Sequence, residues 1–258
     1  RMKPTILLVD DNEDILEFLA DELTEKYEIL TASNGQEALQ IILQEVVNLV
    51  VSDVMMPVMD GFEFCRIIKS NVEYSHVPVI LLTAKNTLQS KIEGLEMGAD
   101  AYIEKPFAME YLQVQIANLL ANRNKIKDYF AHSPLVHIKS MAHTKSDEHF
   151  LDKLNEIICN NLEATDLDVE RLARLMNLSR PTLFRKIKSI ADLTPNELVN
   201  ITRLKKAAEL LAEGDYKIYE VSDMVGYNSQ TAFGRNFFKQ FGMTPTEYQK
   251  SKQVERNS

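Results

Sequence analysis

The chain has no long apolar run and only two cysteines among its 258 residues. No segment approaches the roughly 18 consecutive apolar residues that cross a bilayer, and no signal-peptide pattern opens the sequence. Cys65 and Cys159 lie in different halves, which excludes a disulfide framework and a cysteine-based metal motif. We therefore expect a soluble, cytoplasmic protein whose cysteines are reduced and packed in the core.

Basic residues are scarce in the first half. Residues 1–130 carry 11 basic and 21 acidic side chains, whereas residues 131–258 carry 18 and 17. Within the second half, Arg171–Lys206 holds nine basic and two acidic residues. Charged residues at 26% and apolar residues at 45% exclude wholesale disorder. The length and the charge asymmetry together predict two domains with different tasks.

Short apolar runs in the first half alternate with patterns of helical period. The runs are rich in Val, Ile and Leu and lack polar alternation, which is typical of strands buried on both faces of a parallel sheet. They are Thr5–Asp10, Glu28–Thr31, Leu49–Asp53, Val77–Leu82 and Ala101–Ile103. Five βα units predict an α/β fold, a flavodoxin-like doubly wound parallel sheet with strand order 2-1-3-4-5. Its last two helices are expected at about Asn86–Met97 and Met109–Ala121.

The second half shows no strand alternation and contains an internal repeat. Shifting the sequence by 50 residues places Ser179–Leu198 on Ser229–Tyr248, with matching Ser, Arg and Thr-Pro-x-Glu positions. In each copy a helix of about eight residues, a turn through Asn177 or Gly226, and a Ser-capped second helix form a helix-turn-helix. We predict a sheet domain at 1–122, a linker at 123–147, and an all-α domain with two helix-turn-helix units at 148–258.

Polar residues follow the apolar runs, at the positions where a doubly wound sheet binds ligands. The first run is followed by Asp10 and Asp11, the third by Asp53, the fourth by Thr83, and the fifth by Lys105. At about 4 Å each carboxylate pair repels by around 4 kcal/mol, so the cluster predicts a cation, and Mg²⁺ suits oxygen ligands. Asp53 would attack a phosphoryl group as the nucleophile, and Lys105 and Thr83 would stabilise the oxygens that gain charge.

These residues belong to motifs that resemble the receiver domain of response regulators, over Ile6 to about Leu120. The matching motifs are Leu7–Asp11, Asp53–Gly61, Leu82–Ala84, Gly98–Tyr102 and Lys105–Phe107. The resemblance implies that Asp53 accepts the phosphoryl group and binds Mg²⁺ together with Asp10, Asp11 and the main-chain carbonyl of Met55. It also implies that Thr83 and Tyr102 form a switch pair, and that Lys105 senses the phosphate beside a typically cis Pro106. The chain would then be no enzyme, beyond its own phosphorylation and dephosphorylation.

An Asp nucleophile on a similar sheet also occurs in phosphatases of the haloacid-dehalogenase type. Those enzymes need a second acid two residues after the nucleophile, where this chain has Met55, so we set that interpretation aside. A metal site is a second alternative, suggested by His132, His137, His143 and His149. Their spacing matches no zinc motif, and surface histidines are favoured.

The second helix of each repeat carries side chains suited to DNA. On one side of the first lie Arg180, Pro181, Thr182 and Arg185, and on one side of the second lie Gln230, Thr231 and Arg235. Because Arg pairs with guanine and Gln with adenine, we expect base contacts from Arg185, Gln230 and Arg235. Phosphate contacts are expected from Lys186, Lys188, Arg203 and Lys239. The alternative, a solvated basic helix face, is disfavoured by the duplicated helix-turn-helix.

From about Asp152 to Tyr248 the chain resembles the DNA-binding domain of the AraC/XylS transcription regulators. The resemblance is carried by Leu172-Ala173, Ser179, Leu183, Arg185, Thr194-Pro195, Arg203-Leu204, Ala207, Leu210-Leu211, Val221, Gly226-Tyr227, Phe233, Arg235, Phe237, Phe241-Gly242 and Thr244-Pro245. Two positions depart from the family pattern. Asp192 stands where Gly is usual, and Ala232 is small where a larger polar or aromatic residue is common.

Together the two resemblances imply a phosphorylation-regulated, sequence-specific DNA-binding transcription regulator of a two-component system. A histidine kinase would phosphorylate Asp53, and the face around Tyr102 would be repacked. That face would then dimerise or release the basic half, so that two copies engage repeated half-sites on double-stranded DNA. The same pair of domains ends hybrid two-component regulators, in which a membrane-anchored sensor and a kinase precede it. A start at Arg1 fits such a fragment, or an artificial start. The alternative function is a phosphate relay or store whose helical half binds protein.

Overall fold

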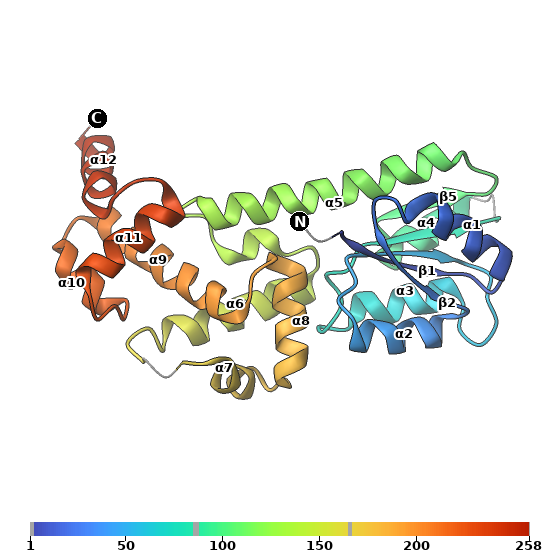
Figure 1. Ribbon diagram of the computed structural model, residues 1–258, viewed down its shortest axis with the longest axis horizontal. Coiled ribbons are helices and arrows are strands. Elements are labelled where there is room, and N and C mark those ends of the chain that lie inside the picture. The colour runs from blue at the N-terminus through green and yellow to red at the C-terminus, as the bar shows by residue number, and fades with distance from the viewer. Residues whose placement is uncertain (1–2, 85–87, 165–166, 258) are drawn as a thin grey trace. The chain divides into compact units, whose positions relative to one another are not determined.

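The computed structural model describes residues 3–84, 88–164 and 167–257. The chain folds into two compact units (Figure 1). Unit 1 comprises Arg1–Asn124 and His143–Asp147, and unit 2 comprises Lys125–Ala142 and Glu148–Ser258. Within the described ranges, every helix is too short or too polar to cross a bilayer.

Unit 1 contains a five-stranded parallel sheet in the order β2-β1-β3-β4-β5, which confirms the predicted doubly wound fold. The strands are β1 (Thr5–Val9), β2 (Glu28–Ala32), β3 (Leu49–Asp53), β4 (Val79–Thr83) and β5 (Ala101–Glu104). The helices are α1 (Glu13–Leu23), α2 (Gly35–Gln44), α3 (Gly61–Ser70), α4 (Leu88–Glu96) and α5 (Met109–His132). The predicted start of α4, at Asn86, lies outside the described residues.

Alternate residues of the central strands pack on opposite faces of the sheet. Leu7 and Val9 of β1 pack into the core that α2 and α3 cover, whereas Ile6 and Leu8 pack into the core that α1 and α5 cover. Because helices cover both faces, the central strands are almost entirely apolar (Figure 1). Polar side chains therefore gather at the strand ends, where the chain leaves the sheet.

The segment predicted as a linker, 123–147, is divided between the two units. α5 continues to His132, and a 3-10 helix, η1, follows at Ile138–Met141. Phe130 and both end residues of η1 are buried in a core of unit 2, with 1–2% of their surface exposed. Residues 125–142 are therefore part of the second folded unit rather than a spacer.

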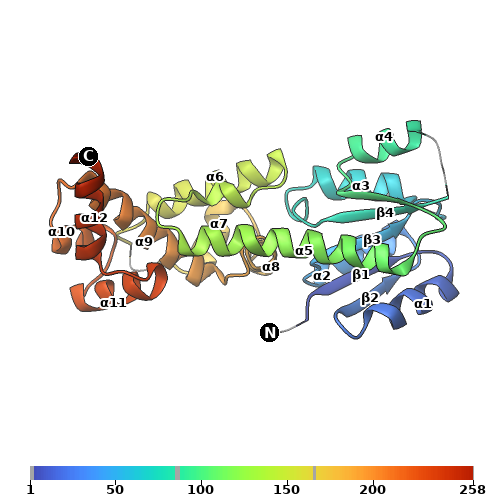
Figure 2. The same cartoon turned by 90° about the horizontal axis from the view of Figure 1, so that it is seen from above.

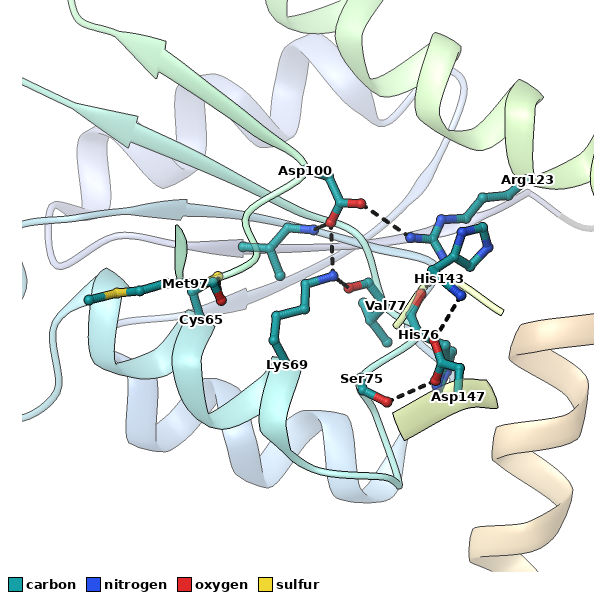
Figure 3. Close-up of polar contacts among 11 residues, drawn as sticks. Cys65, Lys69, Ser75, His76, Val77, Met97, Asp100, Arg123, His143 and Asp147 are labelled. Carbon is teal, nitrogen blue, oxygen red and sulfur yellow. Dashed lines mark hydrogen bonds and ion pairs between the residues drawn. The ribbon is translucent and has the colours of Figure 1, made fainter. Parts of the chain in front are cut away.

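Residues 143–147 return to unit 1 and pack against it through polar contacts (Figure 3). The Ser75 hydroxyl donates to the Asp147 carboxylate at 2.8 Å, and both residues are fully buried. Close by, the Arg123 guanidinium donates to the Asp100 carboxylate at 3.3 Å. Asp100 precedes β5 and accepts from the first amide of β4, so this cluster lies at the opposite end of the sheet from the carboxyl ends of the strands.

The second half of the chain is all-helical, as predicted. Its helices are α6 (Lys145–Cys159), α7 (Val169–Met176), α8 (Arg180–Ala191), α9 (Pro195–Glu213), α10 (Ile218–Met224), α11 (Gln230–Phe241) and α12 (Pro245–Asn257). α7 and α8 form the first helix-turn-helix, α10 and α11 form the second, and α9 connects them (Figures 1 and 2). The predicted duplication is thereby confirmed.

The same local signals shape both helix-turn-helix copies. Ser179 and Ser229 cap α8 and α11, and each side-chain oxygen accepts a backbone N–H three residues ahead at 3.2 Å. In the turns, Asn177 and Gly226 have φ angles of 56° and 83°, in the left-handed region that Asn and Gly tolerate. The turn and the cap together fix where each second helix begins.

Two hydrophobic cores stabilise unit 2, and α9 contributes to both. The first packs the end of α5 with α6, α7 and α8, and the second packs α9 with α10, α11 and α12. Between them the Lys205 ammonium of α9 donates to the main-chain carbonyls of Phe130 at 2.5 Å, Ser133 at 2.6 Å and Val136 at 3.0 Å. Burial lowers the pKa of Lys205 to about 8. Lys205 thus satisfies carbonyls at the carboxyl end of α5.

Candidate functional site

Three carboxylates meet at the carboxyl ends of β1 and β3. Asp10 and Asp11 follow β1, Asp53 is the last residue of β3, and one oxygen of each lies within 4.8 Å of the others. Asp10 and Asp53 are buried, whereas Asp11 is exposed. Burial raises the pKa of Asp10, against the opposing effect of the hydrogen bond from the Asn12 amide. The sequence prediction that these three side chains converge is confirmed.

Lys105 supplies the positive charge of the same site. Its ammonium donates to the Asp53 carboxylate at 2.7 Å and approaches Asp10 at 3.5 Å. Burial alone would lower the pKa of Lys105, but its hydrogen bond to Asp53 and the nearby negative charge raise it. The Lys105–Pro106 peptide bond is cis, as the resemblance implied. The site therefore holds a protonated amine against the side chain predicted to be the nucleophile.

Thr83 and Tyr102 complete the neighbourhood on adjacent strands. Thr83 is the last residue of β4 and is fully buried. Tyr102 of β5 is half-buried, and its ring lies against the backbone of Gly94 in α4, where an added Cβ would come within 2.8 Å of a ring carbon. Beyond Tyr102 the surface is hollowed, and the hollow is lined by Lys91, Tyr102, Glu104, Phe107 and Tyr111 among others.

The loop after β3 is shaped by a glycine that received no role in the sequence analysis. Gly61 opens α3, and a Cβ added there would lie 2.2 Å from the Asp53 carbonyl oxygen. Only glycine therefore lets α3 start this close to the end of β3. Met55 lies in this loop with its side chain 58% exposed. The proposed role of its main-chain carbonyl stays a prediction.

The donor set fits a hard divalent cation. Three carboxylates offer only oxygen ligands, and the single ammonium of Lys105 leaves an excess of negative charge when all three are ionised. Asp10, Asp11 and Asp53 are the residues that could hold Mg²⁺ here.

Most of the residues predicted to contact DNA lie on the surface of α8 and α11. On α8, Arg180 and Pro181 are exposed, while Thr182, Arg185 and Lys188 are half-buried. On α11, Gln230, Thr231, Arg235 and Lys239 are all exposed. Each set occupies one helix and is accessible to a partner.

Of the predicted phosphate contacts, Lys186 is wrong, and Arg203 has a partner within its own unit. Lys186 is 1% exposed, and its ammonium lies 5.2 Å from the centre of the Phe150 ring, inside the unit. Arg203 is half-buried, and its guanidinium donates to the Ala164 carbonyl at 3.0 Å. Lys186 is therefore not placed to reach a DNA phosphate, and Arg203 is held by a main-chain carbonyl of its own unit. The count of basic residues concealed this, because it ignored which side of each helix faces the core.

An exposed phenylalanine on each of these helices escaped the sequence analysis. Phe184 of α8 is 41% exposed and Phe238 of α11 is 53% exposed. The helical period was the available signal, since Phe184 lies four residues after Arg180 and four before Lys188, on the same side.

Comparison with known protein families gives two separate matches. Residues 6–117 match the model of the response regulator receiver domain. Residues 172–251 match a helix-turn-helix domain model of the AraC type. The first match contains the carboxylate site, and the second begins within α7 and covers the rest of both helix-turn-helix copies.

Individual relatives resemble either the whole chain or its first half. Histidine kinase P4 of Formosa agariphila is 39% identical over 247 residues, which is 96% of this chain and 18% of that protein. The probable transcriptional regulator ycf27 of Porphyra purpurea is 45% identical over 125 residues, 48% of this chain and 50% of that protein. A BeF3-activated DrrB receiver domain is 35% identical and covers 46% of this chain and 99% of its own, with a TM-score of 0.43. The chain thus spans half or less of the two curated relatives. It contains a response regulator receiver domain followed by a helix-turn-helix DNA-binding domain of the AraC type.

Proposed function

We propose that this chain is a phosphorylation-regulated, sequence-specific DNA-binding regulator of a two-component system. The observation that carries the proposal is the pairing of the buried Asp53 carboxylate with the Lys105 ammonium at 2.7 Å, inside an acidic cluster at the strand ends. The exposed polar faces of α8 and α11 support the DNA-binding part.

Phosphoryl transfer would start from a phosphohistidine on a partner kinase. An Asp53 carboxylate oxygen attacks the phosphorus, the P–N bond breaks, and the imidazole leaves with its electron pair. The Lys105 ammonium, which now contacts Asp53, turns to a phosphoryl oxygen, and the Thr83 hydroxyl donates to another. Mg²⁺ held by Asp10, Asp11, Asp53 and the Met55 carbonyl would supply charge that balances those oxygens.

The added charge would act on the half-buried Tyr102 through Thr83. Movement of the ring changes the surface formed by α4, β5 and α5, where Tyr102 lines the hollow. We propose that this surface then forms a homodimer, so that two copies of the DNA-binding half engage repeated half-sites.

On DNA, α8 and α11 would occupy successive major grooves. Arg185, Gln230 and Arg235 would contact bases, and Thr182, Thr231 and Pro181 would lie beside them. Arg180, Lys188 and Lys239 would contact phosphates.

The receiver and DNA-binding domains fit a regulator without an enzymatic turnover of its own. The kinase would be a separate protein, or an upstream part of a longer hybrid such as the relative of which this chain matches 18%. Both its kinase and its DNA would meet this chain in the cytoplasm.

The phosphorylation site is tested by intact mass. A small acyl phosphate with Mg²⁺ is expected to add one phosphoryl group to the chain, and Asp53→Asn is expected to abolish the gain. Asp21→Asn, which alters an exposed carboxylate of α1, is the matched control and keeps it. A phosphoryl group that persists in Asp53→Asn would show that the site assignment is wrong.

DNA binding is tested by selecting duplexes from a random pool with the full chain, with and without acyl phosphate. The expected result is an enriched sequence whose log affinity falls steeply with log salt. Arg185→Ala is expected to weaken the preference at one position of the site. No enrichment and a flat salt dependence would favour the alternative, a relay or store with a protein-binding helical half.

A further inference from the structure

The surface of α8 combines basic residues with one aromatic ring. Arg180, Phe184 and Lys188 are spaced by four residues, so the 3.6-residue period places them along one side of the helix. Arg180 is exposed and forms an ion pair with Glu170, and Lys188 forms an ion pair with Asp192. Exposed pairs of this kind contribute about 0–1 kcal/mol, so both cations are available to a stronger anionic partner. Phe184, which is 41% exposed, thus lies between two basic residues along this side of the helix.

The second copy lacks an aromatic side chain at the corresponding position. The 50-residue repeat aligns Phe184 with Gly234, and an added Cβ at Gly234 would meet no heavy atom within 4 Å. The space above α11 is therefore open where α8 carries a ring. Phe238, the exposed phenylalanine of α11, lies one helical turn further along, at the position that corresponds to Lys188.

The position of Phe184 in its helix determines what it can contact. Phe184 is the fifth residue of α8, within the amino-terminal half that a helix-turn-helix turns toward the base edges. In the major groove the prominent apolar group is the C5 methyl of thymine, and phenylalanine is among the side chains that contact it. The flanking cations match the phosphates on either side of the groove.

We propose that Phe184 is a specificity-determining residue that contacts a thymine methyl in the half-site bound by α8. The proposal rests on the DNA-binding function proposed above. Because Gly234 presents no side chain, the half-site bound by α11 has no thymine requirement at the equivalent position. One protein chain therefore binds two half-sites, of which only the one bound by α8 requires a thymine at this position.

The test uses a duplex selected by the full chain and removes one methyl group at a time. Each thymine is replaced in turn by deoxyuridine, which pairs identically and lacks the C5 methyl. Fluorescence anisotropy is expected to show a three- to fivefold loss of affinity, about the value of one buried methyl group, at one thymine of the α8 half-site. In Phe184→Ala the same replacement is expected to have no effect.

Two further variants make the test specific to this position. Phe238→Ala removes a more exposed phenylalanine from the later part of α11 and is expected to leave the deoxyuridine effect intact. Gly234→Phe is expected to create a thymine dependence in the α11 half-site, because the added side chain enters open space. Thermal unfolding of each variant establishes that it is folded.

The outcomes separate this proposal from the function on which it rests. If the unaltered chain selects no DNA, the DNA-binding proposal fails. If it binds DNA and the deoxyuridine effect persists in Phe184→Ala, or disappears equally in Phe238→Ala, the role of Phe184 is overturned. A change in self-association of Phe184→Ala, measured by sedimentation with no change in thymine dependence, would identify the ring as a protein contact and also overturn it.

Discussion

The two helix-turn-helix copies share their backbone signals and differ in the side chains packed around them. Both use a left-handed turn and a serine cap at matching positions. The core residues that α7 and α8 contribute in the first copy, such as Leu183 and Ile187, carry no ring, whereas α11 of the second copy contributes phenylalanine rings. In the second, the Phe237 ring lies 5.7 Å from that of Phe233 and 5.7 Å from that of Tyr248. The comparison indicates that the caps and the turn define the motif, while core and surface are free to diverge.

The largest expected difference lies in the cores. Phe237→Ala is expected to lower the free energy of unfolding by about 3–5 kcal/mol, because it removes a fully buried ring from an aromatic cluster. The milder truncation Ile187→Val in the first copy should cost about 0.5–1.5 kcal/mol. Urea unfolding measures both. A loss in Phe237→Ala no larger than that in Ile187→Val would show that the buried ring does not stabilise the second copy.

The next largest difference is expected in the free energy of unfolding that each turn loses on substitution by alanine. Gly226→Ala is expected to destabilise by more than about 2 kcal/mol, because alanine is strained at a φ of 83° and its Cβ would lie 2.1 Å from the Leu162 carbonyl oxygen. Asn177→Ala, at a φ of 56°, should cost about 1 kcal/mol. The cost is smaller because asparagine already carries a Cβ in the left-handed region, so the substitution removes only its better tolerance of that conformation. The comparison of the two turns fails if both substitutions cost the same in thermal unfolding.

The caps are expected to behave alike. Ser179→Ala and Ser229→Ala should each cost about 1 kcal/mol, because each removes one side-chain acceptor from an otherwise unsatisfied helix N–H. Chemical denaturation of the two variants measures this. A large difference between them would mean that the local signals are not equivalent in the two copies.

The smallest effect is expected at Lys186, a residue predicted from the sequence to contact a DNA phosphate. Lys186→Gln should leave the slope of log affinity against log salt unchanged, because the ammonium is buried. Lys239→Gln, on the exposed side of α11, should reduce that slope by about one. If the two variants change the slope equally, the Lys186 ammonium contacts a DNA phosphate despite its burial.

Sequence patterns predicted what depends on local signals and on general rules of parallel sheets. The strand order, the convergence of Asp10, Asp11 and Asp53, and the doubled helix-turn-helix all follow from such rules. The burial of Lys186 could not be predicted from charge, because a cation packed over the Phe150 ring looks the same in a sequence as a solvated one. Its place in the helical period, beside Leu183 and Ile187, was the available sign.

The inclusion of residues 125–142 in unit 2 was also missed. The apolar residues of this segment, such as Ile126, Phe130 and Ile138, are scattered among polar ones, and Phe130 contacts Lys205, a residue far away in the sequence. Periodicity detects a continuous apolar side of a helix, and it does not detect scattered apolar residues that pack only in the folded unit.

The carbonyls held by Lys205 bear on how the molecule can be dissected. A recombinant second half that begins at residue 148 would lack Phe130, Ser133 and Val136, and the Lys205 ammonium would lose all three acceptors. A first half that ends at residue 122 would lose Arg123, one of the partners of Asp100, and Asp147, which accepts from Ser75. Each half is completed by residues encoded beyond its apparent border, so activity lost on cutting would report an incomplete fold rather than a missing signal.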